Sequence, residues 1–152
     1  EHLVPILRGL IKQKPGLRLH TPNGLHAERI TLQLAILMRQ AGMTTVRLSL
    51  ETTNSVRQQA TGGKVSTEQF AQAVDHLQAA GFGPAELGAY LLAGLPDQPL
   101  SEVEASIRFV QGMGVQVKLV TNSCNVLAEL LLEPLVQSPR MARASNSFAN
   151  AL

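Results

Sequence analysis

Strand-like and helix-like segments alternate along most of this chain, and that alternation constrains the fold more than any other feature. Apolar and β-branched residues form short strand-like runs at residues 17–20, 45–50, 87–92 and 115–120. Strands that alternate with helices of about ten to fifteen residues predict parallel βα units with right-handed crossovers. The predicted fold class is therefore α/β. Four strands are too few to close a barrel, which needs about eight.

Helix boundaries can be read from apolar spacing and from capping residues. The chain should open with a helix that ends before Pro15-Gly16, and a second helix should be closed by Gly42. Ser66 with Gln69 three residues later predicts a capping box ahead of a third long helix. Ser101 and Glu104 predict the same arrangement for a fourth.

Composition limits the classes of function. The 152 residues fit one domain, and thirteen basic against eleven acidic residues give no track of positive charge for nucleic acid. A single cysteine, Cys124, excludes an internal disulfide and cannot supply a zinc or iron-sulfur site alone. Without a signal peptide or a long apolar run, the expected location is cytoplasmic. Because the chain starts at Glu1 rather than methionine, we expect a fragment of a longer protein.

The candidate site lies where the predicted strands end. Ligands bind parallel sheets beyond the carboxyl ends of the strands, so four segments should cluster there: residues 20–26, 49–53, 94–98 and 121–124. Polar or backbone-exposing residues in the first three segments could hydrogen-bond a ligand: Asn23, Ser49, Glu51, Gly94, Leu95 and Gln98. The structural alternatives are a turn at Asn23-Gly24, a cap at Ser49, and an ion pair between Glu51 and Arg47 or Arg57.

Other candidate chemistries are less well supported. His20 and His26 have no neighbouring ligand residues, so no metal site is predicted. The run Thr61-Gly62-Gly63-Lys64 lacks the spacing of a phosphate-binding loop. Lys118 lies in a predicted strand, where it could form a Schiff base with a carbonyl substrate or simply sit at a sheet edge.

Four strings, in this order and at this spacing, resemble the radical SAM (S-adenosylmethionine) superfamily. They are LHTPNGLHA at 19–27, RLSLET at 47–52, RQQATGGK at 57–64 and GLPDQ at 94–98. The similarity covers about residues 17–119 and is greatest to the later part of the core in the subgroup with an amino-terminal cobalamin-binding domain. It implies a fragment of a partial (βα)6 barrel, comprising residues 1–120, followed by a divergent and partly disordered segment at 121–152.

The resemblance also implies cofactors and roles for residues. Such enzymes hold a 4Fe-4S cluster on three cysteines, cleave S-adenosylmethionine and generate a deoxyadenosyl radical, some with cobalamin. Ser49 and Glu51 resemble the contacts to the ribose and methionine parts, residues 94–98 resemble the segment beside adenine, and Asn23 is a further candidate.

Three motifs of that family are missing here: the CxxxCxxC cluster motif, the Gly-Gly-Glu motif of the second strand, and the usual continuation after the sixth strand. The cluster ligands should therefore lie outside this chain, which alone should be inactive. Its expected partner is the missing amino-terminal half of the barrel, and its substrate is an unidentified small molecule. The alternatives are a non-catalytic half-barrel that pairs with another chain, and a Schiff-base lyase that uses Lys118.

Overall fold

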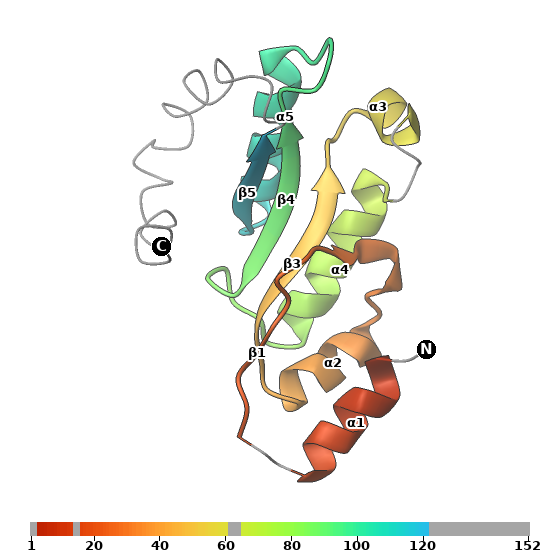
Figure 1. Ribbon diagram of the computed structural model, residues 1–152, viewed down its shortest axis with the longest axis vertical. Coiled ribbons are helices and arrows are strands. Elements are labelled where there is room, and N and C mark those ends of the chain that lie inside the picture. Colours follow the sequence, from red (N-terminus) through yellow and green to blue (C-terminus); the bar gives the residue numbers. More distant parts are fainter. Residues whose placement is uncertain (1–2, 14–15, 61–64, 122–152) are drawn as a thin grey trace.

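A parallel sheet forms the centre of the computed structural model, which describes residues 3–13, 16–60 and 65–121 (Figure 1). The helices are α1 (Leu3–Gln13), α2 (Leu32–Gln40), α3 (Ser55–Ala60), α4 (Thr67–Ala79) and α5 (Leu100–Gly112), with a short 3-10 turn η1 at Ala27–Arg29. The strands are β1 (Leu19–His20), β2 (Leu25–His26), β3 (Met43–Glu51), β4 (Leu87–Ala93) and β5 (Gln116–Thr121).

All strand pairs are parallel, and the strand order is β1-β3-β4-β5. The short strand β2 pairs with the carboxyl-terminal half of β3, so β1 and β2 lie along the same side of β3. This arrangement confirms the predicted α/β class: the parallel βα units form a half-barrel. The carboxyl ends of β3, β4 and β5 lie at one end of the sheet, as the candidate site requires.

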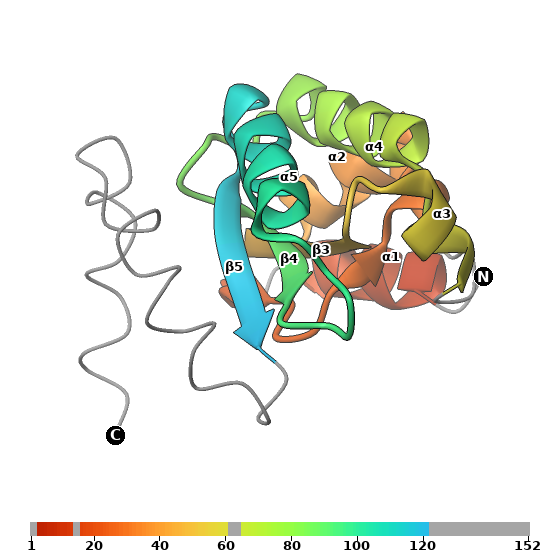
Figure 2. The ribbon, with the colours of Figure 1, turned by 90° about the horizontal axis from the view of Figure 1, so that it is seen from above.

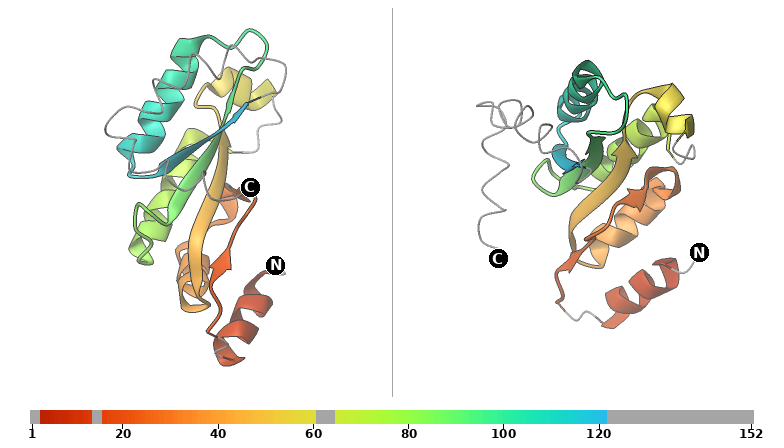
Figure 3. Two further views of the ribbon diagram at one scale, coloured as in Figure 1. Left: turned by 60° about the vertical axis from the view of Figure 1, so that its left-hand side comes forward. Right: turned by 45° about the horizontal axis from the view of Figure 1, so that its top comes forward.

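One face of the sheet is covered by helices α2, α4 and α5 (Figure 2). Side chains at alternate strand positions point to the same face of the sheet, and those that face the helices are buried beneath them. In β3 these are Val46, Leu48 and Leu50, each at most 2% exposed. Helix α1 packs against α2, beyond the β1 side of the sheet (Figure 3). The core consists mainly of Leu, Val, Ile, Ala and Met with a few phenylalanines, in a sequence of which 3% is aromatic.

The opposite face of the sheet is polar and only half-buried. On β3 it carries Thr45, Arg47 and Ser49, which alternate with the buried residues. The register with β4 and β5 places Tyr90 beside Ser49, and Lys118 beside Tyr90, on this same face. In a closed barrel this face would line the interior.

The predicted elements are present, with two differences. Strand β2 was not expected, because its two residues directly follow the turn at residues 21–24. The predicted cap of α5 at Ser101 is wrong: the helix begins at Leu100 after Pro99, whose extended backbone (φ −71°, ψ 147°) makes it the N-cap without a side-chain bond. The capping box of Ser66 and Gln69 is confirmed by both of its hydrogen bonds.

Some sequence predictions concern residues outside the described ranges. They are the Thr61–Lys64 turn, Cys124 and the segment after Thr121. The division into residues 1–120 and 121–152 therefore stays a prediction. Within the described ranges, no helix has the length and apolar character needed to cross a membrane.

Candidate functional site

The carboxyl end of β3 is irregular where the candidate site begins. Ser49 pairs with Tyr90 and Glu51 pairs with the next residue of β4, Leu91, so Leu50 is an extra residue in the strand. Glu51 has a φ of 69°, which is uncommon outside glycine and costs about 1–3 kcal/mol. Bulges of this kind are frequent beside active sites, because they redirect side chains at the end of a strand.

The first strand-end loop approaches Ser49 closely. A side chain at Gly24 would overlap the Ser49 hydroxyl, and its Cβ would lie 2.9 Å from the Ser49 backbone nitrogen. The Tyr90 hydroxyl donates a 2.8 Å hydrogen bond to the Pro22 carbonyl and so fixes the same loop to β4. Asn23, between these two anchored residues, is exposed. The structure thus brings the loop of Asn23 next to the end of β3.

The loop after β4 is held by its own glutamine. The Gln98 side chain donates to the Leu92 carbonyl at 3.1 Å and accepts from the Leu95 amide at 3.2 Å. Gly94 and Asp97 both adopt positive φ angles, 77° and 54°. Because the Gln98 amide is engaged inside the loop, it maintains the path of residues 94–98. The contact to a cofactor predicted for Gln98 stays a prediction.

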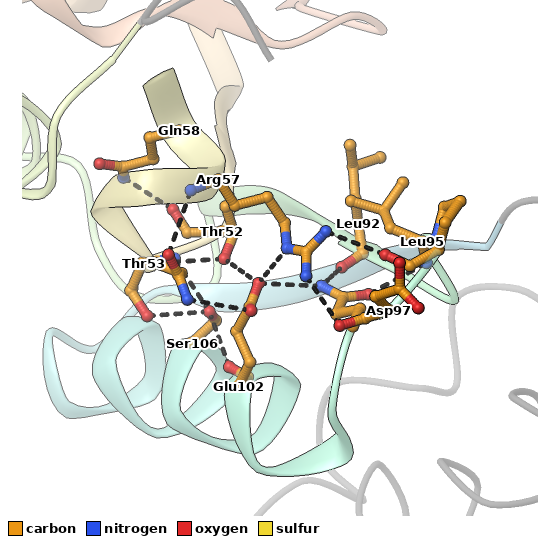
Figure 4. A network of polar contacts seen from close by, with 12 residues as sticks. Thr52, Thr53, Arg57, Gln58, Leu92, Leu95, Asp97, Glu102 and Ser106 are labelled. Carbon is orange, nitrogen blue, oxygen red and sulfur yellow. Dashed lines mark hydrogen bonds and ion pairs between the residues drawn. The ribbon is translucent and has the colours of Figure 1, made fainter. Parts of the chain in front are cut away.

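A buried carboxylate joins the loops after β3 and β4 (Figure 4). It belongs to Glu102 in the first turn of α5, whose side chain is 6% exposed. Its Oε1 accepts hydrogen bonds from Thr52 Oγ1 (2.8 Å), Arg57 Nε (2.9 Å) and Gln98 Nε2 (3.4 Å). Its Oε2 accepts from Asn54 Nδ2 (3.1 Å). We call these five residues the Glu102 network.

Arg57 extends this network to the backbone of the next loop. Its Nη1 donates to the Pro96 carbonyl and its Nη2 to the Asp97 carbonyl, both at 3.1 Å. One guanidinium therefore contacts α5 through Glu102 and the loop after β4 through two carbonyl groups (Figure 4). Nearby, the Thr53 amide donates to Ser106 Oγ at 3.0 Å and attaches the end of β3 to α5 a second time.

The surroundings of Glu102 keep it ionised. Burial alone would raise the pKa of this carboxyl group, but hydrogen bonds from Thr52, Arg57 and Gln98, together with the Arg57 charge, lower the pKa below 4.5. Glu102 is therefore an anion at neutral pH. Arg57 and the side-chain amides of Asn54 and Gln98 all donate hydrogen bonds to this negative charge.

Sequence reasoning did not identify Glu102. The sequence suggested Glu51 as an ion-pair partner of Arg57, and in the structure Arg57 forms an ion pair with Glu102. A signal was present: Glu102 and Ser106 are four residues apart, and each directly precedes an inward apolar residue, Val103 or Ile107. Polar residues so close to an apolar stripe can be buried, and both are.

Histidines and lysine on the polar face form no metal cluster. Within the described ranges, no group of three or more His, Cys, Asp or Glu side chains could hold a metal ion. His20 Nδ1 lies 2.9 Å from Thr45 Oγ1, and His26 is exposed. Burial and the charge of Arg47 lower the pKa of Lys118, which is the direction that Schiff-base chemistry requires. The lyase alternative stays a prediction.

Comparison with known proteins identifies one family. A family model described as the radical SAM superfamily matches residues 2–110. No curated protein matches the chain. The matched residues include the loops after β2, β3 and β4 and the whole Glu102 network, and they end before Lys118.

Substitution of Glu102 tests how much the network stabilises the fold. Because the pKa is lowered in the folded protein, ionised Glu102 adds stability above about pH 4.5, and this stability is lost as the pH falls through the lowered pKa. We expect Glu102→Gln to reduce the free energy of unfolding at pH 7 by about 1.5–3 kcal/mol, the contribution of a hydrogen bond to a charged group.

Urea unfolding of both proteins between pH 7 and pH 3 measures this effect. The difference between them should shrink below about pH 4.5. Other carboxyl groups with a lowered pKa, such as Glu86 and Glu68, are present in both proteins and cancel in the comparison. A difference that stays constant down to pH 3 would show that the charge of Glu102 is not what stabilises the network.

Proposed function

The chain belongs to the radical SAM superfamily, and we propose on that premise that its strand-end loops form part of a pocket for S-adenosylmethionine. The proposal rests mainly on the geometry at the carboxyl end of β3. There Ser49 lies half-buried on the polar face of the sheet, and half-buried Glu51 follows it in the bulge, where it pairs with Leu91 near the end of β4. Members of this family use S-adenosylmethionine together with an iron-sulfur cluster.

The residue types at this end of the sheet fit the polar groups of S-adenosylmethionine. The Ser49 hydroxyl can donate and accept, and the Glu51 carboxylate can accept from ribose hydroxyls or from an amino group. Gly94 has no side chain, so the backbone at Gly94 and Leu95 can come close to a flat base such as adenine. Asn23, in the adjacent loop, is a further candidate for a polar contact.

The residues of this chain do not fit an iron-sulfur cluster. The whole sequence contains one cysteine, and no alternative ligand cluster exists within the described ranges. We therefore place the cluster ligands outside this chain. Bound S-adenosylmethionine would supply the radical chemistry, and the side chains described here would bind and orient it.

The half-barrel also suggests where the rest of such a protein would lie. In the described sheet β5 pairs on one side, with β4, and no strand continues the sheet beyond β1 and β2. Unpaired strand edges are templates for further strands, and the polar face of β3 and β4 suits the interior of a barrel. We propose that the missing amino-terminal half completes the sheet here. Pairing without catalysis is the alternative function.

The source of the cluster can be tested by anaerobic reconstitution with iron and sulfide. We expect this 152-residue chain to acquire no stoichiometric cluster by absorption spectroscopy and sulfide analysis, and the full-length protein to acquire one. If the protein belongs to the cobalamin-binding subgroup, as we also propose from the four strings, the full-length protein should show corrin absorption. If the 152-residue chain binds a cluster and cleaves S-adenosylmethionine, the proposal that the cluster ligands lie outside it is wrong. If the full-length protein contains no bound corrin, the proposed membership of the cobalamin-binding subgroup is wrong.

Two substitutions at the end of β3 test the cofactor pocket itself. In the full-length protein, Ser49→Ala and Glu51→Gln should each weaken binding of S-adenosylmethionine about tenfold, because each removes a hydrogen bond worth about 1.5 kcal/mol. Equilibrium dialysis with labelled S-adenosylmethionine measures the affinity.

Thr45→Val is the matched control. It removes a hydroxyl from the same face of β3 but near the other end of the strand, where Thr45 contacts His20. The control should bind like the wild type. Equal affinities for all four proteins would mean that the end of β3 does not contact the cofactor.

A further inference from the structure

The Glu102 network joins the two segments to which the proposed function assigns different parts of S-adenosylmethionine. Thr52 directly follows Glu51, which is proposed to contact the ribose or methionine part. Residues 94–98, proposed to contact adenine, are reached by Arg57 through the carbonyl groups of Pro96 and Asp97. Arg57 itself lies in α3, which begins four residues after Glu51.

Resting on that proposed function, we propose that Arg57 is a positioning residue that sets the distance between the two halves of the S-adenosylmethionine pocket. Its guanidinium donates in three directions at once: to Glu102 at 2.9 Å and to two successive backbone carbonyls at 3.1 Å. A planar group with fixed donors imposes one geometry on its acceptors, which a lysine ammonium cannot do.

The acceptor side of this contact is equally constrained. Glu102 is almost fully buried and receives three further side-chain donors, from Thr52, Asn54 and Gln98. The carboxylate therefore cannot follow a displaced Arg57 without losing those bonds. Gln98 belongs to the loop that Arg57 holds, so both side chains fix the loop after β4 relative to the end of β3.

A second arginine–glutamate pair provides a comparison within the same chain. Arg39 at the end of α2 bonds Glu86 at 2.6 Å, and Glu86 directly precedes β4. This pair also joins separate elements, and Arg39 lies over the Phe82 ring at 5.1 Å. It lies at the amino end of β4, away from the strand ends that carry the candidate pocket. Its role is structural, which makes it a matched control.

The experiment compares Arg57→Lys with Arg39→Lys in the full-length protein. Affinities for S-adenosylmethionine, 5′-deoxyadenosine and free methionine are measured by equilibrium dialysis, and thermal unfolding is recorded without ligand. We expect Arg57→Lys to weaken both adenine-containing ligands by roughly tenfold, since two directed hydrogen bonds to their loop are lost. Any binding of methionine should be unchanged. Arg39→Lys should lower thermal stability and leave all affinities within about twofold.

The outcomes separate this inference from the proposed function. If the wild type binds S-adenosylmethionine and Arg57→Lys binds it equally well, Arg57 only stabilises the fold and the inference is overturned. Equal affinity losses for Arg57→Lys and Arg39→Lys would overturn it too, because general destabilisation would then explain both. If the wild type binds neither adenine-containing ligand, the proposed function fails, and the positioning role fails with it.

Discussion

The ionised carboxylate of Glu102 makes the contacts on which the loops at the carboxyl end of the sheet depend. A buried charge is tolerated only when hydrogen bonds and an opposite charge replace its lost hydration. Here the replacements come from Thr52 and Asn54 after β3, from Arg57 in α3 and from Gln98 after β4. The hydrogen bonds to this one carboxylate therefore hold together several loops that the sheet alone does not connect.

The fold was largely predictable from sequence because its signals are local. Apolar spacing located the long helices and strands β1, β3, β4 and β5, and the Ser66 box marked the start of α4. The contacts of Glu102 with Thr52, Asn54 and Arg57 were not predicted, since these residues lie about 45–50 positions from Glu102 and no spacing rule connects them. The N-cap of α5 was predicted wrongly at Ser101. Serine is a favoured N-cap residue, but the helix begins at Leu100 and its N-cap is Pro99.

The candidate site was predicted from topology and from the family resemblance, and the structure adds physical reasons for the path of the backbone there. Gly24 is required because any side chain there would overlap Ser49. Glu51 occupies a strained backbone conformation that a bulge in β3 produces. In the function proposed above, this chain would provide a polar surface at the strand ends, and the cluster ligands and the rest of the barrel would come from outside it.

Hydrogen exchange of the full-length protein, with and without S-adenosylmethionine, tests the pocket most directly. Bound cofactor should slow amide exchange in peptides covering residues 49–57 and 94–99, where the strand ends and the Glu102 network lie. Peptides covering residues 81–86, before β4 begins, should exchange at the same rate in both states. Binding that protects other segments and leaves 49–57 and 94–99 unchanged would contradict the assignment of the cofactor to this end of the sheet.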